Sequence, residues 1–301
     1  MKIFDFKQFN EIEILNSHKN IIRCVCALGK DMFASCGDDL SIRIWKNNKE
    51  IHNLQEHTHR INCLINLGYM SSIETRSVYM ASGSKDKKIK IWNTETGKQY
   101  KKTLNLHTKS VLTMTYISDE YQLASAGADN IIIIWDWINA KGKYSLKGHT
   151  DEITCLLYLY DGLLVSGSKD TTIRIWNTIN NSKIEIKRHK HKINCLVNII
   201  EKKMFASGSD DRKIKIWNKN GQEMQSIEVD SESIISLAYL GKDLLAFGSL
   251  DKFFIEIINI ENNTVIKKFQ GHKSSVNSLA ILNDDLLISG SSDTKIKLWK
   301  I

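Results

Sequence analysis

The stretch SGSKDKKIKIWN, Ser82–Asn93, recurs with small changes along the whole chain. Similar phrases close at six tryptophans, Trp45, Trp92, Trp135, Trp176, Trp217 and Trp299. In each phrase an Asp precedes the Trp by six residues, and a Ser precedes that Asp by four. Successive tryptophans of this set are 47, 43, 41, 41 and 82 residues apart. Because the last spacing is twice 41, we expect a seventh copy between Trp217 and Trp299.

A second phrase that begins with His precedes each copy, as in HTHRINCL from His57. The six phrases start at His18, His57, His107, His149, His189 and His272. Their β-branched residues alternate as in short strands, and the GSKD-type clusters between them are typical of tight turns. One small sheet cannot bury both of its faces, whereas sheets stacked in a ring can. The sequence therefore predicts an all-β array of similar units.

The His phrase, the Ser-Gly-Ser-x-Asp turn and the closing Trp-Asn or Trp-Asp resemble the WD-repeat family of β-propellers. The resemblance covers almost the whole chain and implies one seven-bladed domain over residues 1–301. Only two residues follow Trp299, so the last blade would lack its outer strand. The resemblance implies that an N-terminal strand at about residues 10–15 completes blade 7, which leaves no open sheet edge there.

Composition favours a protein of the cell interior. The 301 residues carry a formal net charge of +8, which permits a nucleic acid or an acidic membrane as partner. The lysines are spread along the chain without a basic arm, which favours a solvated surface instead. No apolar run is long enough to span a membrane, and the N-terminus does not resemble a secretory signal. We expect a cytoplasmic location, with the nucleus as the alternative.

The six cysteines show neither pairing nor the spacing of metal ligands. Four of them, Cys24, Cys63, Cys155 and Cys195, stand six residues after the His of their copy. Thr or Ser holds that position in the other copies, which indicates packing of a small side chain. We therefore expect no metal, no cofactor and a reducing compartment.

His, Ser, Asp and Trp recur together, and the first three also make up catalytic triads. Six equivalent sets follow the structural unit and do not mark one location, so we predict that the protein is not an enzyme. The resemblance implies that the four side chains of a blade form a buried hydrogen-bond chain, which suits their donors and acceptors. In the fourth copy these structural residues are His149, Ser166, Asp170 and Trp176.

The faces and the channel then remain for function, since loops carry it more often than the strands that position them. In the family, the usual binding face receives side chains five and three residues after the His, and one before the Asp. The first position gives Arg23, Asn62, Leu112, Thr154, Asn194, Ile235 and Asn277; the second includes Arg60, Glu152 and Lys192; the third includes Lys85 and Lys169. Mixed polarity with apolar anchors suits protein or peptide partners better than a phosphate track.

The seventh copy is degenerate and lies at about residues 225–265. Its phrase FGSLDKFFIEIIN, Phe247–Asn259, has no Trp, and Asp230 and Phe247 stand where His and Ser belong. Alternation puts Ile258 at the Trp position and lengthens the preceding turn by one residue. Losing donors and acceptors together can be nearly neutral, so we expect apolar packing in this blade. We also expect at least one of Asp230 and Asp251 to be solvated.

Two hypotheses concern the aromatic residues of this copy. In one, Leu250 and either Phe253 or Phe254 reach the binding face as an apolar anchor, which adds Leu250 and Phe253 to the predicted site. In the other, both Phe side chains pack between blades in place of the missing Trp. A longer loop in the second copy, Gly68–Val78, is expected to leave on the opposite face.

The predicted function is a non-catalytic interaction scaffold or adaptor. It would bind partner proteins or peptides on the propeller face, as subunits of a larger complex. The alternative is nucleic-acid or acidic-lipid binding through the lysine-rich surface.

Overall fold

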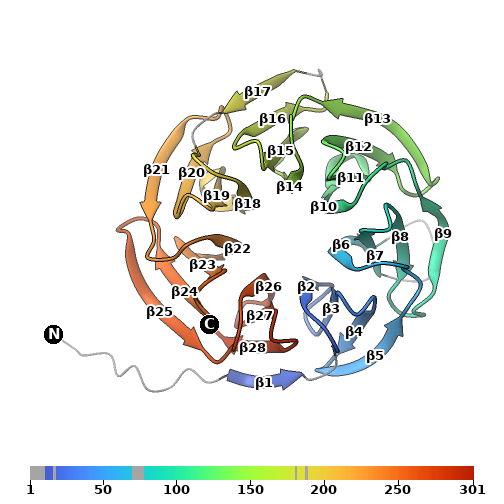
Figure 1. Cartoon of the computed structure of the whole chain (residues 1–301), viewed down its shortest axis with the longest axis horizontal. Helices are drawn as coiled ribbons and strands as arrows, with labels where there is room; N and C mark the ends of the chain where they lie inside the picture. Colours follow the sequence, from blue (N-terminus) through green and yellow to red (C-terminus); the bar gives the residue numbers. More distant parts are fainter. Residues whose placement is uncertain (1–10, 16–17, 70–77, 180–181, 187–188) are drawn as a thin grey trace.

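Seven four-stranded antiparallel sheets stand around one central axis in the computed structural model (Figure 1). The structure describes residues 11–15, 18–69, 78–179, 182–186 and 189–301. Each sheet, here called a blade, starts at the axis with the strand that follows the His of its copy. These innermost strands are β2 (Ile22–Ala27), β6 (Ile61–Tyr69), β10 (Val111–Ile117), β14 (Ile153–Tyr158), β18 (Ile193–Ile199), β22 (Ile234–Gly241) and β26 (Val276–Asn283). They number the blades from 1 to 7.

The chain then runs outward through each blade. The second strands are β3 (Met32–Gly37), β7 (Val78–Ser84), β11 (Gln122–Gly127), β15 (Leu163–Ser168), β19 (Met204–Ser209), β23 (Leu244–Ser249) and β27 (Leu286–Ser291). The third strands, which carry the repeated Trp, are β4 (Ile42–Lys46), β8 (Ile89–Asn93), β12 (Ile131–Asp136), β16 (Ile173–Asn177), β20 (Lys213–Asn218), β24 (Phe254–Asn259) and β28 (Ile296–Lys300).

Outer strands complete the first six blades. They are β5 (Lys49–Leu54), β9 (Gln99–Leu104), β13 (Lys141–Lys147), β17 (Lys183–Ile186), β21 (Glu223–Glu228) and β25 (Thr264–Gln270). The strands of the degenerate blade 6 thus run from 234 to 270, and residues 225–228 lie in the outer strand of blade 5. Two short 3-10 turns, η1 (Ser118–Glu120) and η2 (Ile200–Lys202), are the helical elements of the described residues, and no helix among them could cross a membrane.

The N-terminal strand closes the ring, as predicted. β1 (Glu11–Leu15) pairs antiparallel with β28, from Glu11 opposite Trp299 to Leu15 opposite Ile296. It is the outer strand of blade 7, so the two ends of the described chain share one sheet (Figure 1). The backbone groups of β28 therefore find partners that an open ring would leave unpaired.

The core lies between the blades. Trp92 of blade 2 is fully buried and packs with Ile42 and Ile44 of blade 1. A buried indole removes a large apolar area from water, so each such contact stabilises one inter-blade seam. In blade 6 Ile258 stands in place of the Trp and packs with Ile227 of blade 5 and with Phe247 of its own blade.

The register of blade 6 confirms the predicted alignment. Leu245 lies opposite Ile258 and Phe247 opposite Glu256. In blade 2 the corresponding pairs are Met80 with Trp92 and Ser82 with Lys90. Ile258 therefore occupies the Trp position, and the turn before β24 is one residue longer than its counterparts.

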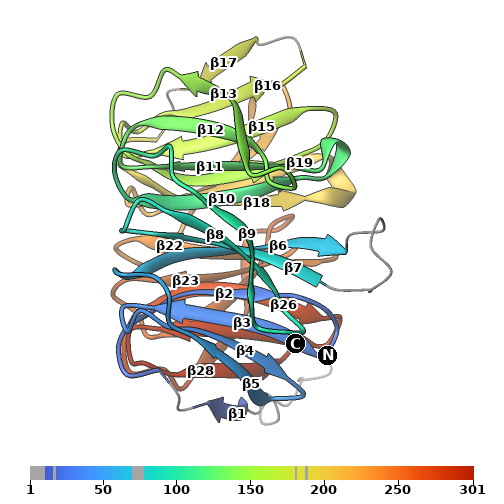
Figure 2. The ribbon, with the colours of Figure 1, turned by 90° about the vertical axis from the view of Figure 1, so that its right-hand side faces the viewer.

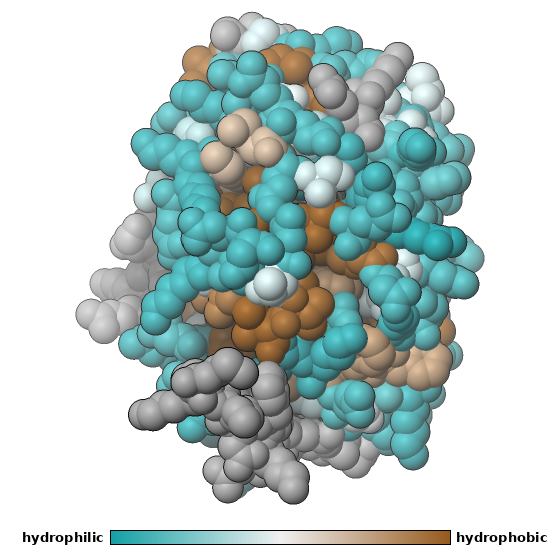
Figure 3. Space-filling model, turned by 90° about the vertical axis from the view of Figure 1, so that its left-hand side faces the viewer, coloured by the Kyte–Doolittle hydropathy of each residue, from teal (hydrophilic) through white to brown (hydrophobic). Residues whose placement is uncertain are grey.

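The wall of the propeller is partly apolar. The outer strands β17, β21 and β25 expose Ile184, Met224, Val265 and Ile266, and Figure 3 shows apolar surface between polar groups on this side of the molecule. The predicted exit of the longer loop in blade 2 rests on residues 70–77, which lie outside the described residues.

Candidate functional site

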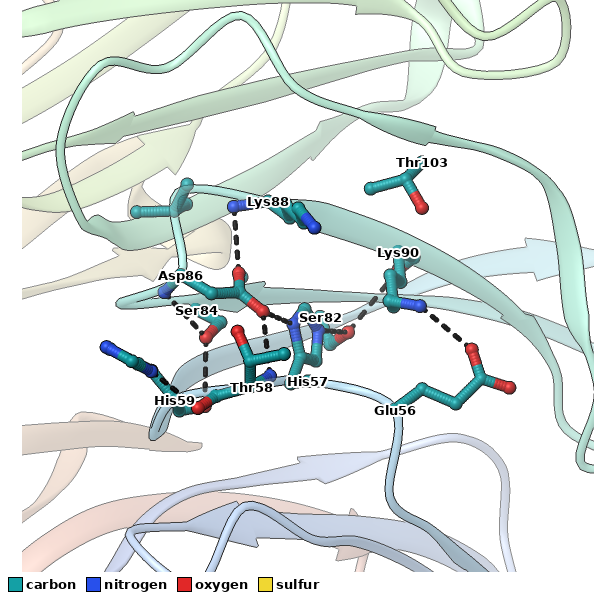
Figure 4. A network of polar contacts seen from close by, with 12 residues as sticks. Glu56, His57, Thr58, His59, Ser82, Ser84, Asp86, Lys88, Lys90 and Thr103 are labelled. Atoms are coloured by element: carbon teal, nitrogen blue, oxygen red, sulfur yellow. Dashed lines mark hydrogen bonds and ion pairs between the residues drawn. The ribbon is translucent and has the colours of Figure 1, made fainter.

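The repeated polar residues form a buried chain of hydrogen bonds in each blade that carries them. In blade 4, His149 Nδ1 lies 2.8 Å from Asp170 Oδ2. His149 Nε2 lies 2.7 Å from Ser166 Oγ, and Trp176 Nε1 donates to that oxygen at 2.8 Å. The carboxylate of Asp170 also accepts from the backbone N–H of Thr150 at 3.0 Å. Figure 4 shows the same arrangement in blade 2 around His57, Ser82 and Asp86.

The donors and acceptors of this chain match one another. A carboxylate only accepts and an indole N–H only donates, so the imidazole carries hydrogen on Nδ1 and the serine hydroxyl donates to Nε2. Ser166 has no exposed surface, and His149 is 6% exposed. A substrate therefore has no access to a hydroxyl that a triad would use as nucleophile.

The carboxyl groups of these chains have lowered pKa values. Burial by itself raises the pKa of Asp86, but the hydrogen bond and attraction of His57, with the amides of Lys88 and Thr58, lower it to about 2. The same balance lowers the pKa of Asp211 and Asp293 to about 2. It also lowers the pKa values of the remaining three carboxyl groups of the set, Asp39, Asp129 and Asp170.

Blade 6 keeps a remnant of this arrangement. The Asp230 side chain is fully exposed and pairs with Lys252 Nζ at 2.6 Å, as expected of at least one of the two carboxylates. Asp251 accepts from Ser231 Oγ at 2.8 Å and from the Glu232 backbone N–H at 3.0 Å. Ser231 thus donates to the carboxylate as the His does in the other blades, although it stands one residue later in the chain than the His position. The sequence analysis missed it, although the longer turn of this copy was a signal for such a shift.

A hollow of about 380 Å³ opens at the end of the channel where the innermost strands begin. Every blade contributes to it. Nine of the eleven predicted contact residues line it, namely Arg23, Asn62, Leu112, Thr154, Lys169, Asn194, Ile235, Leu250 and Asn277. Arg60, Glu152 and Lys192, three residues after their His, complete the lining. We call this set of residues the channel mouth.

Two predicted residues do not line the channel mouth. Lys85 is exposed on the turn between β7 and β8, and Phe253 is 45% exposed on the turn between β23 and β24. Phe254 is half-buried at the start of β24, where Lys268 Nζ lies 5.1 Å from its ring centre. The hypothesis that both Phe side chains replace the Trp is therefore wrong, because Ile258 fills that position and Phe253 remains exposed.

Several polar residues of the channel mouth also tie neighbouring blades together. Asn62 Nδ2 donates to Val111 O at 2.7 Å, and Asn277 Nδ2 donates to Ile22 O at 2.8 Å. The equivalent bonds in two other blades run from Asn194 to Ile234 O and from the Thr154 hydroxyl to Ile193 O. In each case the acceptor stands four residues after the start of the next His phrase or its equivalent. Sequence reasoning assigned these side chains to a partner and missed this bond.

The charges of the channel mouth are only partly paired. Arg23 makes a two-pronged ion pair with Asp38, at 2.7 and 2.8 Å, and Lys169 pairs with Glu152 at 2.6 Å. Arg60 and Lys192 make no side-chain ion pair or hydrogen bond within the described part of the chain.

The apolar members of the channel mouth also remain accessible. Leu112 and Ile235 are half-buried, and Leu250 is 53% exposed. With Arg60 and Lys192, they are the side chains of the mouth that are available to a ligand.

Replacing Phe253 by serine tests the packing of blade 6. Because its ring is 45% exposed, we expect the free energy of unfolding to change by less than about 0.5 kcal/mol. The same change at Phe247, which is 2% exposed, is the control and should cost about 3 kcal/mol or more. Urea unfolding measures both. Similar losses at the two positions would contradict this account of the blade.

Two family profiles match the sequence. One, described as "IFT122 first beta-propeller", matches residues 71–300. The other, described as "WD domain, G-beta repeat", matches residues 9–46 and 48–93. Together they extend over the length of the propeller.

The chain is also similar to curated proteins. The p21-activated protein kinase-interacting protein 1-like of Danio rerio is 24% identical over 239 residues, which are 77% of this chain and 63% of that protein. Cell division control protein 4 of Saccharomyces cerevisiae is 31% identical over 216 residues, 71% of this chain and 25% of that protein. Elongator complex protein 2 of the same yeast is 31% identical over 218 residues, 62% of this chain and 28% of that protein. The chain thus spans less than two thirds of each of these relatives.

Proposed function

Because this chain belongs to the WD-repeat family of seven-bladed β-propellers, we propose that it is a non-catalytic scaffold that binds a protein or peptide at the channel mouth. Members of this family generally serve as protein-interaction scaffolds and generally lack catalytic activity. The proposal further makes the protein an adaptor within a larger complex, in the cytoplasm or the nucleus. Two of its relatives bear names that refer to an interaction or to a complex.

The observation that carries this proposal is the variety of side chains at one structural position. Five residues after the His or its equivalent, the seven blades carry Arg23, Asn62, Leu112, Thr154, Asn194, Ile235 and Asn277. In contrast, the buried His, Ser, Asp and Trp hydrogen-bond chain is the same in six blades. A repeat that varies where it meets the channel and stays constant inside has the pattern of a recognition surface on a scaffold.

The chemistry of the channel mouth suits a short protein segment. Leu112, Ile235 and Leu250 offer apolar contact, and Arg60 and Lys192 offer unpaired positive charge. A hollow of about 380 Å³ accommodates a few side chains of a peptide. Carboxylates also stand at the rim, among them Asp38 and Glu152, which disfavours a continuous track for phosphates.

The test is affinity purification from the source cells with a channel-mouth variant. Leu250→Ser combined with Arg60→Ser removes an apolar and a charged contact without breaking an inter-blade bond. We expect partner recovery to fall about tenfold or more, since few residues dominate a typical interface. The melting temperature of the variant should stay unchanged. Arg23 and Asn277 are poorer choices, because both also make intramolecular bonds.

The control is Ile200→Ser, which changes a 71% exposed side chain at the opposite end of the innermost strand. Equal recovery by wild type, channel-mouth variant and control would refute the proposed site. A salt series addresses the alternative partners. Retention of nucleic acid or of anionic vesicles that falls steeply with salt would favour the lysine-rich surface instead.

A further inference from the structure

A second hollow, of about 300 Å³, lies on the outer half of blade 3. It is lined by Ile131 and Ile133 of β12, by Leu106 before the innermost strand, and by Gly142–Ser145 of β13. The strands β12 and β13 lie at the circumference of the ring, away from the channel (Figures 1 and 2). We call this hollow the blade 3 groove.

The groove exists because blade 3 departs from the repeat at one position. Two residues before the closing Trp, or before Ile258 in blade 6, the other blades carry a charged residue. In four blades this residue makes an ion pair with a residue of opposite charge on the outer strand, and in blade 6 the acid and the base have exchanged places. These pairs are Arg43 with Glu50, Arg174 with Glu185, Lys215 with Glu223 and Glu256 with Lys268. Blade 3 has Ile133 there, and the residue opposite it on β13 is Ser145.

Blade 3 lacks the long charged side chain that lies over the Trp in other blades. In blade 2 the long side chain of Lys90 extends over Trp92, with Nζ 5.8 Å from the ring centre. In blade 3 Ile133, at 5% exposed, and Trp135, at 1%, are both buried without such a chain, but Leu106 beside them remains 55% exposed. Gly142 keeps the groove open, because a Cβ at that residue would come within 2.5 Å of Leu106 Cδ1. Leu106 and the half-buried Ile131 give the hollow an accessible apolar surface, and concave apolar surfaces are where ligands usually bind.

Positive charge flanks the groove. Lys143 belongs to its lining, and Lys147 lies opposite Ile131 on the same face of the sheet. Both are exposed and form no ion pair with any described residue. The strand β13 reads KGKYSLK and has no acidic residue. Hydrogen bonds from Asn139 and the attraction of nearby Lys143 lower the pKa of Asp136 in β12, so Lys143 is partly neutralised and Lys147 is the freer charge. Among the described strands none pairs with its far edge, since β13 is the last strand of its sheet.

We propose that the blade 3 groove binds an extended segment of a partner protein that carries an apolar side chain between acidic residues. The apolar side chain packs on the exposed Leu106 and the half-buried Ile131. The acidic residues on either side pair with Lys143 and Lys147, which selects against basic segments. An extended backbone can add to the free edge of β13 at the same time. This surface is separate from the channel mouth, so one propeller can hold two partners.

The test uses a variant that restores the repeat. Ile133→Arg with Ser145→Glu installs in blade 3 the pair that Arg174 and Glu185 make in blade 4, so the fold has a precedent for it. Random peptides displayed on phage are selected for binding to the wild-type protein. The binding of the selected peptides is then measured on the wild type and on the variant. We expect enriched peptides with an aromatic or aliphatic residue between acids, and binding to the variant weaker by about tenfold or more.

The charge contribution has its own matched pair of variants. Lys143→Glu with Lys147→Glu should weaken the selected peptide by a similar factor, measured by fluorescence anisotropy. Lys101→Glu with Lys102→Glu makes the same charge change on the neighbouring outer strand β9 and should have little effect. Enrichment of basic peptides, equal binding to wild type and restored variant, or no enrichment at all would each overturn the proposal.

Discussion

Replacing Asp170 by alanine is expected to lower the free energy of unfolding by about 3–5 kcal/mol, because it removes the shared acceptor of a buried network. The carboxylate accepts from Thr150 N–H, and Thr172 donates to it through both its amide and its hydroxyl. His149, whose side chain is fully buried, would keep an Nδ1–H without a partner. A buried donor left unpaired costs its full desolvation free energy. Urea unfolding followed by circular dichroism measures the loss.

Blade 6 provides the matched control for this experiment. Within the described residues, the Asp251 carboxylate accepts two hydrogen bonds, from Ser231 Oγ and from the Glu232 amide, and it has no buried His as a partner. Asp251→Ala should therefore cost about 1–2 kcal/mol. Equal losses at Asp170 and Asp251 would contradict the view that the His-linked network is what makes the carboxylate important.

Acid should unfold the protein between about pH 4 and pH 2. The six His-linked carboxyl groups all have lowered pKa values, and three of them, Asp86, Asp211 and Asp293, have values of about 2 against an ordinary 3.8. A lowered carboxyl pKa contributes stability that is fully present above the ordinary value and is lost as the pH falls through the folded-state value. At about 1.4 kcal/mol per pKa unit, each such group contributes about 2 kcal/mol.

The three groups with a pKa of about 2 together contribute about 6 kcal/mol, a large share of the roughly 5–15 kcal/mol that stabilises a whole domain, and the other three of the six groups act in the same direction. Their side chains are at most 8% exposed, so solvent screens these contributions little. Urea midpoints measured at decreasing pH should fall steeply below about pH 4. An Asp170→Asn variant loses one titrating group and should be less sensitive to the same acidification. A urea midpoint that is as high at about pH 2 as at neutral pH would refute the role of these carboxylates.

Much of the architecture could be predicted from the sequence because its information is local. A Ser, an Asp and a Trp at fixed spacing from one another, preceded by a His, place four hydrogen-bonding groups within one small sheet. Six such sets determine the number, order and phase of the blades. Alternation also places Ile258 correctly in the seventh, since a strand shifted by one residue would put Glu256 at the position where the other copies carry Ile or Leu.

The position of the channel mouth was also predictable, but its chemistry was not. Counting from the His or its equivalent, and for Lys169 and Leu250 from the Asp that follows them, brings nine predicted side chains together at one end of the axis. Whether Asn62 is available to a partner depends on Val111, which belongs to the next blade and contributes its carbonyl. Whether Arg60 is paired depends on which carboxylates come within reach in space. Contacts between blades join residues about 40 positions apart, and a pattern within one repeat does not show them.

The sequence by itself determined a seven-bladed ring, its closure by β1 and the identity of the residues around the channel. Only the tertiary structure decided which of those residues are already bonded, that Ser231 replaces a His, and that Ile133 leaves a groove. The physical reason is the same in each case. Repeated hydrogen bonds within a blade are fixed by spacing along the chain, whereas exposure and pairing depend on side chains contributed by other strands and other blades.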